Sequence, residues 1–161
     1  MKIIFICGQG GTGKSTLAKK ILKSYGGEAK IISMDALRRE DPNIPNQKVR
    51  ETILNQIQNS FNEDLVIVDY ALDTVYYRKE FFSCLTFPDD TELIIIGARP
   101  SLDTVFQWQE KRQNSPLSET QISKCVQAYN RFQAPTTEEF NEFKLKEITA
   151  LTIDTSQLGD I

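Results

Sequence analysis

The chain of 161 residues contains no histidine, the side chain that most often serves as a general acid or base near neutral pH. Any general base must then be a carboxylate, a lysine, a tyrosine, a thiolate or water. Cysteine is also scarce, and Cys7, Cys84 and Cys125 lie far apart without the spacing of a metal-binding motif. We expect all three to be reduced residues of the core.

The sequence also lacks a long hydrophobic run and an excess of basic charge. Its first apolar segment has about six residues, shorter than the core of a signal peptide and far shorter than a membrane span, so we expect a cytoplasmic protein. The net charge of −3 gives no general attraction to nucleic acid or to an anionic membrane. A polynucleotide would therefore need a local basic patch. With no repeat or linker, residues 1–161 should form one domain.

The most specific motif is Gly8–Thr16, which fits the P-loop pattern G-x-x-x-x-G-K-[ST]. It follows a β-branched apolar run, Lys2–Cys7, and precedes a segment of helical periodicity that ends at Gly26-Gly27. Glycines let backbone N–H groups surround an anion, and the start of the next helix adds further donors. The motif predicts a site for a nucleoside triphosphate. The alternative, a turn that only links strand to helix, fits these flanks less well.

Individual residues of this motif have expected roles. Lys14 would contact the β- and γ-phosphates, and the Ser15 hydroxyl would bind Mg²⁺. The candidate ATP-binding residues are Gly8, Gln9, Gly10, Gly11, Thr12, Gly13, Lys14, Ser15 and Thr16.

A second apolar strand, Leu65–Asp69, ends in an acid and has the form of a Walker B strand. Asp69 should face the magnesium ion, unless it is a buried acid paired for structural reasons. Further strands are expected at 29–33, 93–97 and 150–153. Five strands that alternate with helices predict an α/β fold, a three-layer α/β/α sandwich with right-handed crossovers.

The region between the last two strands has the pattern of two polar helices. The first begins near Asp103 and leads into a loop at 113–116, and Ser118 with Gln121 predicts a capping box for the second. Ile122, Cys125, Val126, Tyr129 and Phe132 would form the apolar face of the second helix. We interpret this helix pair, about 104–133, as a small lid.

Asp35 and Arg38 directly follow the strand at 29–33. Ligands of open parallel sheets bind at the carboxyl ends of the strands, so both residues are well placed for a substrate. A hydroxyl acceptor is protonated at neutral pH and gains from a carboxylate that orients it and accepts its proton. Alternatively, Asp35 only caps a helix and Arg38 is a solvated charge.

Taken in order, these motifs resemble the P-loop kinases over residues 1–153, and most closely the kinase domain of phage and bacterial 5′-hydroxyl polynucleotide kinases. The resemblance lies in Gly8–Thr16, Met34–Arg38, Val66–Asp69 and Glu110–Gln113. It implies a P-loop fold with strand order 2-3-1-4-5, ATP and Mg²⁺ as cofactors, and a 5′-hydroxyl of a polynucleotide or nucleotide as acceptor.

The same resemblance implies roles for three residues. Asp35 would be the general base, Arg38 would hold an acceptor phosphate and Arg112 would be the lid arginine. The chain departs from the family in two ways. Its lid loop carries only Lys111 and Arg112, with Arg131 later on the lid helix, and 70–73 lacks the asparagine common after the Walker B acid.

Other functions stay open. A nucleoside monophosphate kinase would use Arg38 on a nucleotide phosphate, but a clear second pair of arginines and the glycine usual before Asp35 are missing. A small-molecule hydroxyl kinase would differ only in its acceptor pocket. An NTP-dependent switch without an acceptor is a third possibility. No water-positioning glutamine stands out in the sequence, and a lid favours the exclusion of water.

Overall fold

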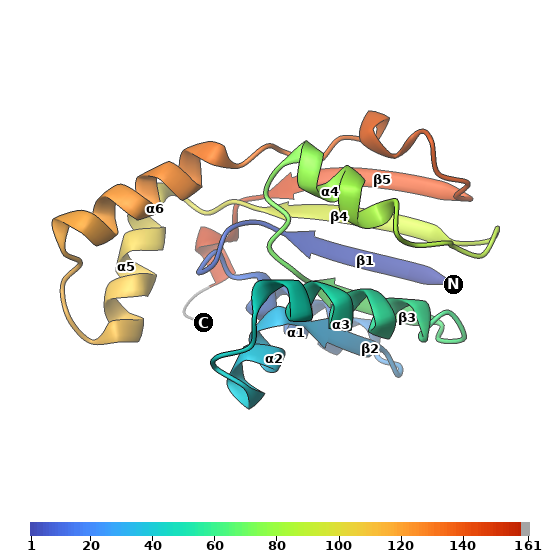
Figure 1. Cartoon of the computed structure of the whole chain (residues 1–161), viewed down its shortest axis with the longest axis horizontal. Coiled ribbons are helices and arrows are strands. Elements are labelled where there is room, and N and C mark those ends of the chain that lie inside the picture. The colour runs from blue at the N-terminus through green and yellow to red at the C-terminus, as the bar shows by residue number, and fades with distance from the viewer. Residues whose placement is uncertain (159–161) are drawn as a thin grey trace.

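The structure, a computed structural model, describes residues 1–158. Five strands form one parallel sheet in the order β2-β3-β1-β4-β5, with helices on both faces (Figure 1). The strands are β1 (Lys2–Cys7), β2 (Lys30–Ser33), β3 (Leu65–Asp69), β4 (Glu92–Ala98) and β5 (Glu147–Ile153). The predicted three-layer architecture and the strand order implied by the resemblance are both confirmed.

The helices follow the sequence pattern closely. They are α1 (Lys14–Tyr25), α2 (Met34–Glu40), α3 (Asn46–Gln58), α4 (Val75–Phe82), α5 (Leu102–Gln113) and α6 (Glu119–Arg131), with 3₁₀ helices η1 (Glu138–Phe140) and η2 (Thr155–Leu158). Ser118 and Gln121 form the predicted capping box at the start of α6. Among the described helices, none is both long and apolar enough to cross a membrane.

The middle of the sheet is apolar on both faces, which is why helices pack on each side. On one face, Phe5 of β1 lies against Phe81 and Phe82 of α4, with ring centroids 5.7 and 5.1 Å apart, and α3 adds its own buried side chains. On the other face, Leu17 and Ala18 of α1 join a smaller apolar cluster. This core fixes the strands whose ends carry the site.

All five strands run in one direction, so their carboxyl ends meet at one edge of the sheet. The P-loop follows β1, α2 follows β2 without a break, and Asp69 is the last residue of β3. Ser33 and Asp69 are register partners across β2 and β3. In Figure 1, α5 and α6 project beyond this same edge. The fold thus gathers the predicted site residues at one edge.

A buried ion pair connects α4 to η1. Arg78 Nε lies 2.6 Å from Glu139 Oε1, and Arg78 Nη2 lies 3.2 Å from Glu139 Oε2. Arg78 Nη1 also donates to the Leu72 carbonyl at 3.0 Å. The two charged side chains are only 0% and 1% exposed. Two parallel charge-assisted hydrogen bonds satisfy both charges without water.

One expectation about buried residues is wrong, and a second one, the apolar face of α6, holds in part. All three cysteines are free, but Cys84 is exposed, whereas Cys7 and Cys125 are buried; burial raises the pKa of the Cys7 thiol to about 11. In α6, Cys125 is the one buried residue, and Ile122 is 40% exposed. The reason is that α6 packs on α5 and extends away from the sheet, so its apolar face meets one helix instead of the core.

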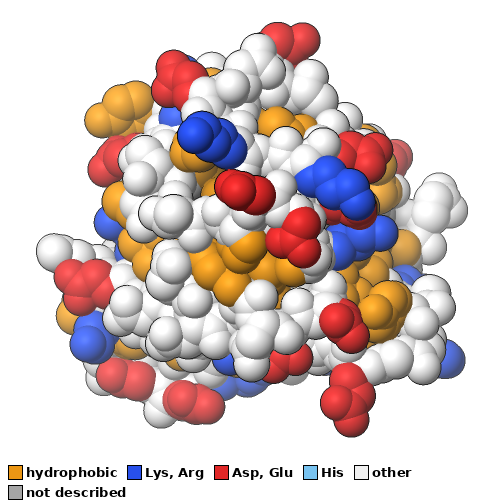
Figure 2. All heavy atoms as spheres, turned by 90° about the vertical axis from the view of Figure 1, so that its right-hand side faces the viewer, with side chains coloured by type: hydrophobic (Ala, Val, Ile, Leu, Met, Phe, Trp, Pro, Cys, Tyr) orange, Lys and Arg blue, Asp and Glu red, His pale blue; other side chains and the backbone are white. Residues whose placement is uncertain are grey.

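The opposite edge of the sheet, where the strands begin, carries none of the predicted site residues. Figure 2 views this end and shows a band of hydrophobic atoms with acidic and basic side chains around it. Glu92 lies between Lys2 and Lys146, at 3.7 and 3.4 Å from their ammonium groups. These charges border a cavity of about 250 Å³.

Candidate active site

Three glycines set the conformation of the P-loop. Gly8, Gly11 and Gly13 have φ angles of 144°, 76° and 83°, a region that other residues rarely adopt. A Cβ atom on Gly8 would also lie 2.7 Å from the carbonyl oxygen of Ala98, so a side chain does not fit there. Gly13 is the N-cap of α1. Glycine conformations of this kind turn successive N–H groups toward one concavity, the arrangement that binds phosphate.

The remaining residues of the motif hold the loop together. Thr12 Oγ1 and Lys14 Nζ both donate to the Gln9 carbonyl, at 2.8 and 2.7 Å. Thr155, which lies in η2, donates from its Oγ1 to the Thr12 carbonyl at 2.6 Å. Gly10 lies exposed at the tip of the loop, and Thr16 follows in the first turn of α1. Sequence reasoning missed Thr155, because a lone threonine after the last strand carries no motif.

Lys14 is folded back into the protein and is only 4% exposed. Burial lowers the pKa of its ammonium group, and the carboxylates of Asp69 and Asp35 act in the opposite direction. The Gln9 carbonyl is its hydrogen-bond partner. A phosphate anion would strengthen the charged form of Lys14 far more than a neutral carbonyl does, so the side chain is prepared for the predicted contact.

Ser15, Asp35 and Asp69 meet at the start of α1, as the sequence predicted for two of them. Ser15 Oγ lies 2.5 Å from Asp69 Oδ2 and 3.0 Å from Asp35 Oδ2, and Ser33 Oγ donates to Asp69 Oδ2 at 3.2 Å. One hydroxyl proton can serve only one of the two carboxylates at a time. The cluster therefore has more acceptor oxygens than donors.

Asp69 is fully buried, and its Oδ1 has no hydrogen-bond partner among the described residues. Burial raises the pKa of this carboxyl, while Lys14 and the hydrogen bond from Ser15 lower it. An unpaired buried carboxylate oxygen beside a hydroxyl and a second carboxylate is a hard-oxygen donor set that fits Mg²⁺. Residues 1–158 contain no cluster of three or more acidic, cysteine or histidine ligands, so water and phosphate oxygens would have to complete the shell.

Asp35 is not the cap of α2. Ser33 is the N-cap, and its hydroxyl accepts a hydrogen bond from the backbone N–H of Ala36. This contradicts the purely structural role considered for Asp35, which instead lies exposed in the first turn of the helix with its carboxylate directed at Ser15. Arg38 lies one turn further on and donates to the side chain of Asn46 on α3.

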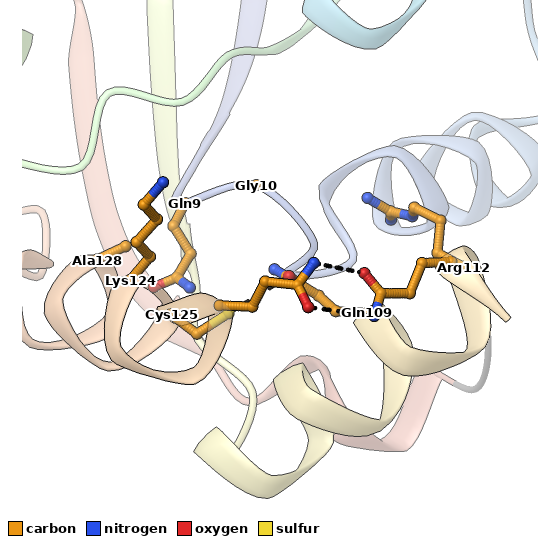
Figure 3. A pocket seen from close by; sticks show the side chains of 9 residues that line it. Gln9, Gly10, Gln109, Arg112, Lys124, Cys125 and Ala128 are labelled. Atoms are coloured by element: carbon orange, nitrogen blue, oxygen red, sulfur yellow. Dashed lines mark hydrogen bonds between the residues drawn. The ribbon is translucent and has the colours of Figure 1, made fainter. Parts of the chain in front are cut away.

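Two cavities adjoin Gln9 and Gly10 at the tip of the P-loop. The first, about 500 Å³, lies under α5 and α6 and contains Arg112 (Figure 3). Burial is the main cause of the lowered pKa of Lys14, and the charge of Arg112 acts in the same direction; a contact of Arg112 with the donor phosphates stays a prediction. The cavity is lined by Gln9, Gly10, Gln109, Arg112, Gln113, Gln121, Lys124, Cys125 and Ala128. The sequence did not single out these glutamines, because only the fold brings them to the P-loop.

The second cavity, about 710 Å³, lies on the other side of Gly10, between α2, α3, α4 and the end of α6. It brings Arg38 together with Arg50 of α3 and Arg131 of α6. Sequence reasoning missed Arg50. The helical pattern of α3 could have indicated it, because Arg50 directly follows the buried Val49 and so lies at the margin of the apolar face of α3.

The end of α6 is tied to the loop after β3. Arg131 Nε lies 2.8 Å from Asp73 Oδ2, the Gln133 N–H donates to the Asp73 carbonyl at 2.8 Å, and the Val75 N–H donates to Gln133 Oε1 at 2.9 Å. On the sheet side, the guanidinium of Arg99 lies 4.0 Å from the centre of the Tyr129 ring. The base of the helix pair is thus fixed between β4 and the second cavity.

Comparison with known proteins identifies the family. The sequence model described as "Chromatin associated protein KTI12" matches residues 1–150. The chain belongs to the KTI12 family. No curated protein matches it.

Solved structures share the fold of this KTI12-family protein at low identity. Kti12 of Chaetomium thermophilum, in complex with ADP-AlF3, superposes with a TM-score of 0.62 at 16% identity, over 90% of this chain and 88% of that one. A gluconokinase from Sinorhizobium meliloti has a TM-score of 0.57 at 17% identity, with 95% and 82% covered. A fungal RNA kinase has a TM-score of 0.55 at 17% identity, with 91% and 37% covered. These structures confirm the P-loop fold, whereas the closer likeness to polynucleotide kinases stays a prediction.

Proposed function

We propose that this KTI12-family protein is an ATP-dependent kinase that transfers the γ-phosphate to a hydroxyl acceptor. The observation that carries the proposal is the position of Asp35. Its exposed carboxylate lies 3.0 Å from the P-loop Ser15 hydroxyl, on the helix that also supplies Arg38 to the second cavity. A carboxylate next to the P-loop, on a helix that also lines the neighbouring cavity, suits a general base for phosphoryl transfer to an alcohol.

The donor side of the proposal rests on the P-loop. Its glycine conformations and the N-terminus of α1 would hold the phosphates, and Lys14 would exchange the Gln9 carbonyl for a phosphate oxygen. Ser15 and Asp69 would hold Mg²⁺, which neutralises charge on the phosphates when bound. Arg112 would approach from the first cavity. The complex of the Chaetomium Kti12 with ADP-AlF3 is in keeping with a nucleotide at this loop.

The acceptor side rests on Asp35 and the second cavity. Asp35 would accept the proton of the attacking hydroxyl, and Arg38 would hold a phosphate next to the reacting sugar. With three arginines and two carboxylates in its lining, the cavity suits an acceptor that carries phosphate groups. A 5′-hydroxyl of a polynucleotide or nucleotide is therefore the leading acceptor. The names of two proteins that share the fold, an RNA kinase and a gluconokinase, are in keeping with this proposal.

Two specific observations favour other functions. Arg131 and Arg50, the second of which the sequence did not reveal, supply further cations beside Arg38. A nucleoside monophosphate kinase would use them on its acceptor phosphate. Glutamines line the cavity next to the P-loop, and one of them could orient water in an NTP-dependent switch.

One experiment separates these functions. The protein is incubated with Mg²⁺, γ-labelled ATP and, in turn, a 5′-hydroxyl oligonucleotide, a 3′-phosphorylated nucleoside, a nucleoside 5′-monophosphate, a small sugar alcohol or no acceptor. We expect label on the first two acceptors, and Lys14→Ala serves as the inactive control. Label on the 5′-monophosphate alone would identify a monophosphate kinase, and free phosphate at the same rate with and without acceptors would identify a switch.

A further inference from the structure

The second cavity ends at an exposed aromatic surface on α4. Tyr77 lines the cavity and is 51% exposed, and its neighbour Tyr76 is 69% exposed. The two rings lie edge to face with centroids 5.5 Å apart. The other side of the same short helix is fully buried through Arg78, Phe81 and Phe82. The helix therefore holds Tyr77 in the lining of the cavity and Tyr76 against Tyr77, with both rings exposed and outside the core.

Exposed tyrosines in such a place call for a ligand with flat apolar faces. Large aromatic side chains lose free energy when they stay in water, and adjacent ones at the edge of a cavity are typical of binding surfaces. Cations lie nearby. Arg50 and Arg38 line the same cavity, and the charge of each acts on the Tyr70 hydroxyl in its wall. A chain of bases joined by phosphates combines the two features that this surface can bind.

We propose that Tyr76 and Tyr77 stack on the bases that follow the reacting nucleotide of a single-stranded nucleic acid, with Arg50 on a phosphate between them. Base–aromatic stacking is tolerant of sequence and is supported by cationic side chains along the backbone. The proposal rests on the proposed function, because it continues the acceptor site outward from Asp35. A mononucleotide or a small alcohol would occupy only the inner cavity and leave the tyrosines in water.

The net charge of −3 bears on how a nucleic acid would bind to Tyr76, Tyr77 and Arg50. A generally acidic protein does not attract nucleic acid over its whole surface, so binding has to come from a local site. Among the residues of this cavity, Asp73 is already paired with Arg131, and Glu80 lies 3.9 Å from Arg50. The approach of a phosphate would draw Arg50 away from this long contact at little cost.

The test is equilibrium binding without chemistry. Fluorescence anisotropy is measured with 3′-labelled, 5′-hydroxyl RNA and DNA oligomers of about eight nucleotides. Tyr76→Ala and Tyr77→Ala should each weaken binding about five- to 150-fold, the range for one lost stacked base. Tyr77→Phe keeps the ring and should bind normally. Tyr25→Ala is the matched control, since Tyr25 is 47% exposed at the opposite edge of the sheet.

A second arm identifies what the rings contact. In a series of oligomers, one abasic site is moved stepwise from the second nucleotide onward. When the abasic site removes the base that stacks on a tyrosine, substitution of that tyrosine should no longer weaken binding. Arg50→Ala should weaken all oligomers alike and flatten the salt dependence. Three results would each overturn the proposal: unchanged binding in the alanine variants, an equal loss in Tyr25→Ala, or no binding by the unaltered protein. The exposed tyrosines would then fit a protein partner better.

The two proposals fail in different ways. If the stacking proposal is wrong and the kinase proposal right, a 3′-phosphorylated nucleoside is still phosphorylated, and the tyrosine variants act equally on short and long acceptors. If the kinase proposal is wrong, no hydroxyl acceptor receives label, whereas oligomer binding still responds to Tyr76 and Tyr77.

Discussion

The Ser15 hydroxyl lies 2.5 Å from Oδ2 of Asp69, although 54 positions separate the two residues in sequence. This contact joins the first helical turn after the P-loop to the end of β3. Ser15 and Asp69 would hold Mg²⁺ here, because the hydroxyl and the unpaired carboxylate oxygen of Asp69 are ligands of the kind that the ion prefers. Several predictions depend on this pair and its neighbours.

Magnesium binding should depend on pH through Asp69. Burial raises the pKa of this carboxyl above its usual 3.8, and below the raised pKa a proton competes with the ion. Affinity for Mg²⁺ in the presence of ADP should therefore rise as pH increases through that pKa, and should be lost in Asp69→Asn. Isothermal titration measures this at a series of pH values, upward from the lowest pH at which circular dichroism shows the protein folded. A flat profile in the unaltered protein would contradict it.

Ser15→Ala should raise the Mg²⁺ concentration needed for half-maximal turnover, because one inner-sphere oxygen is lost. Thr12 is a useful comparison, since its hydroxyl is held by the Gln9 carbonyl within the loop. Thr12→Ser keeps that hydroxyl and should leave the metal requirement unchanged. Identical metal titrations for Ser15→Ala and Thr12→Ser would remove Ser15 from the metal site.

Lys14→Ala should abolish turnover while the fold persists. The side chain is buried, but its one recorded hydrogen bond goes to the Gln9 carbonyl, and burial disfavours its charge. Loss of the ammonium group therefore removes a contact to phosphate without breaking an ion pair of the core. Circular dichroism melting and single-turnover kinetics are measured together. A variant that melts far earlier yet turns over normally per folded molecule would show a structural role instead.

Asp35→Asn should slow the chemical step by about 10²–10⁴-fold if the acceptor is a hydroxyl, with ATP affinity nearly unchanged. Arg38→Ala should act differently, mainly on acceptors with a phosphate beside the reacting sugar. Rates with a 3′-phosphorylated and an unphosphorylated nucleoside check both. Because Asp35 also contacts Ser15, the metal titration of Asp35→Asn is needed too, and a restored rate at high Mg²⁺ would place Asp35 at the metal instead of at the proton.

The buried ion pair gives a prediction about stability. Glu139→Gln should destabilise the protein by about 3–5 kcal/mol, because it leaves the fully buried Arg78 without its counter-charge. Replacing both partners, Arg78→Met with Glu139→Leu, should restore much of this loss, since the apolar pair leaves no buried charge. Urea unfolding of the three proteins provides the comparison. A double variant that is no more stable than Glu139→Gln would contradict this expectation and would show that the ion pair stabilises the fold more than an apolar pair does.

Sequence predicted best where the information is local. The P-loop and the Walker B strand were found from contiguous patterns, and α1, β3 and the Ser118 capping box follow from spacing and cap residues. The P-loop and Asp69 form one site because the carboxyl ends of parallel strands meet at one edge of the sheet. This rule can be applied to a sequence as soon as its strands are predicted.

Sequence predicted poorly where a residue acts through a distant partner. Arg50 and Tyr77 reach the cavity of Arg38 only after α3 and α4 pack on the sheet, and Thr155 meets Thr12 only after β5 is in place. Aspartate is a favoured N-cap residue, so the sequence allows Asp35 as the cap of α2, but Ser33, two residues earlier, is the N-cap.

The three contacts that tie Arg131 and Gln133 to Asp73 and Val75 have a thermodynamic consequence. These contacts join the helix pair beside the first cavity to the loop beside the second cavity, so a ligand that moved one side would change the energy of the other. Such coupling is reciprocal: ATP must change the affinity for the acceptor by the same factor by which the acceptor changes the affinity for ATP.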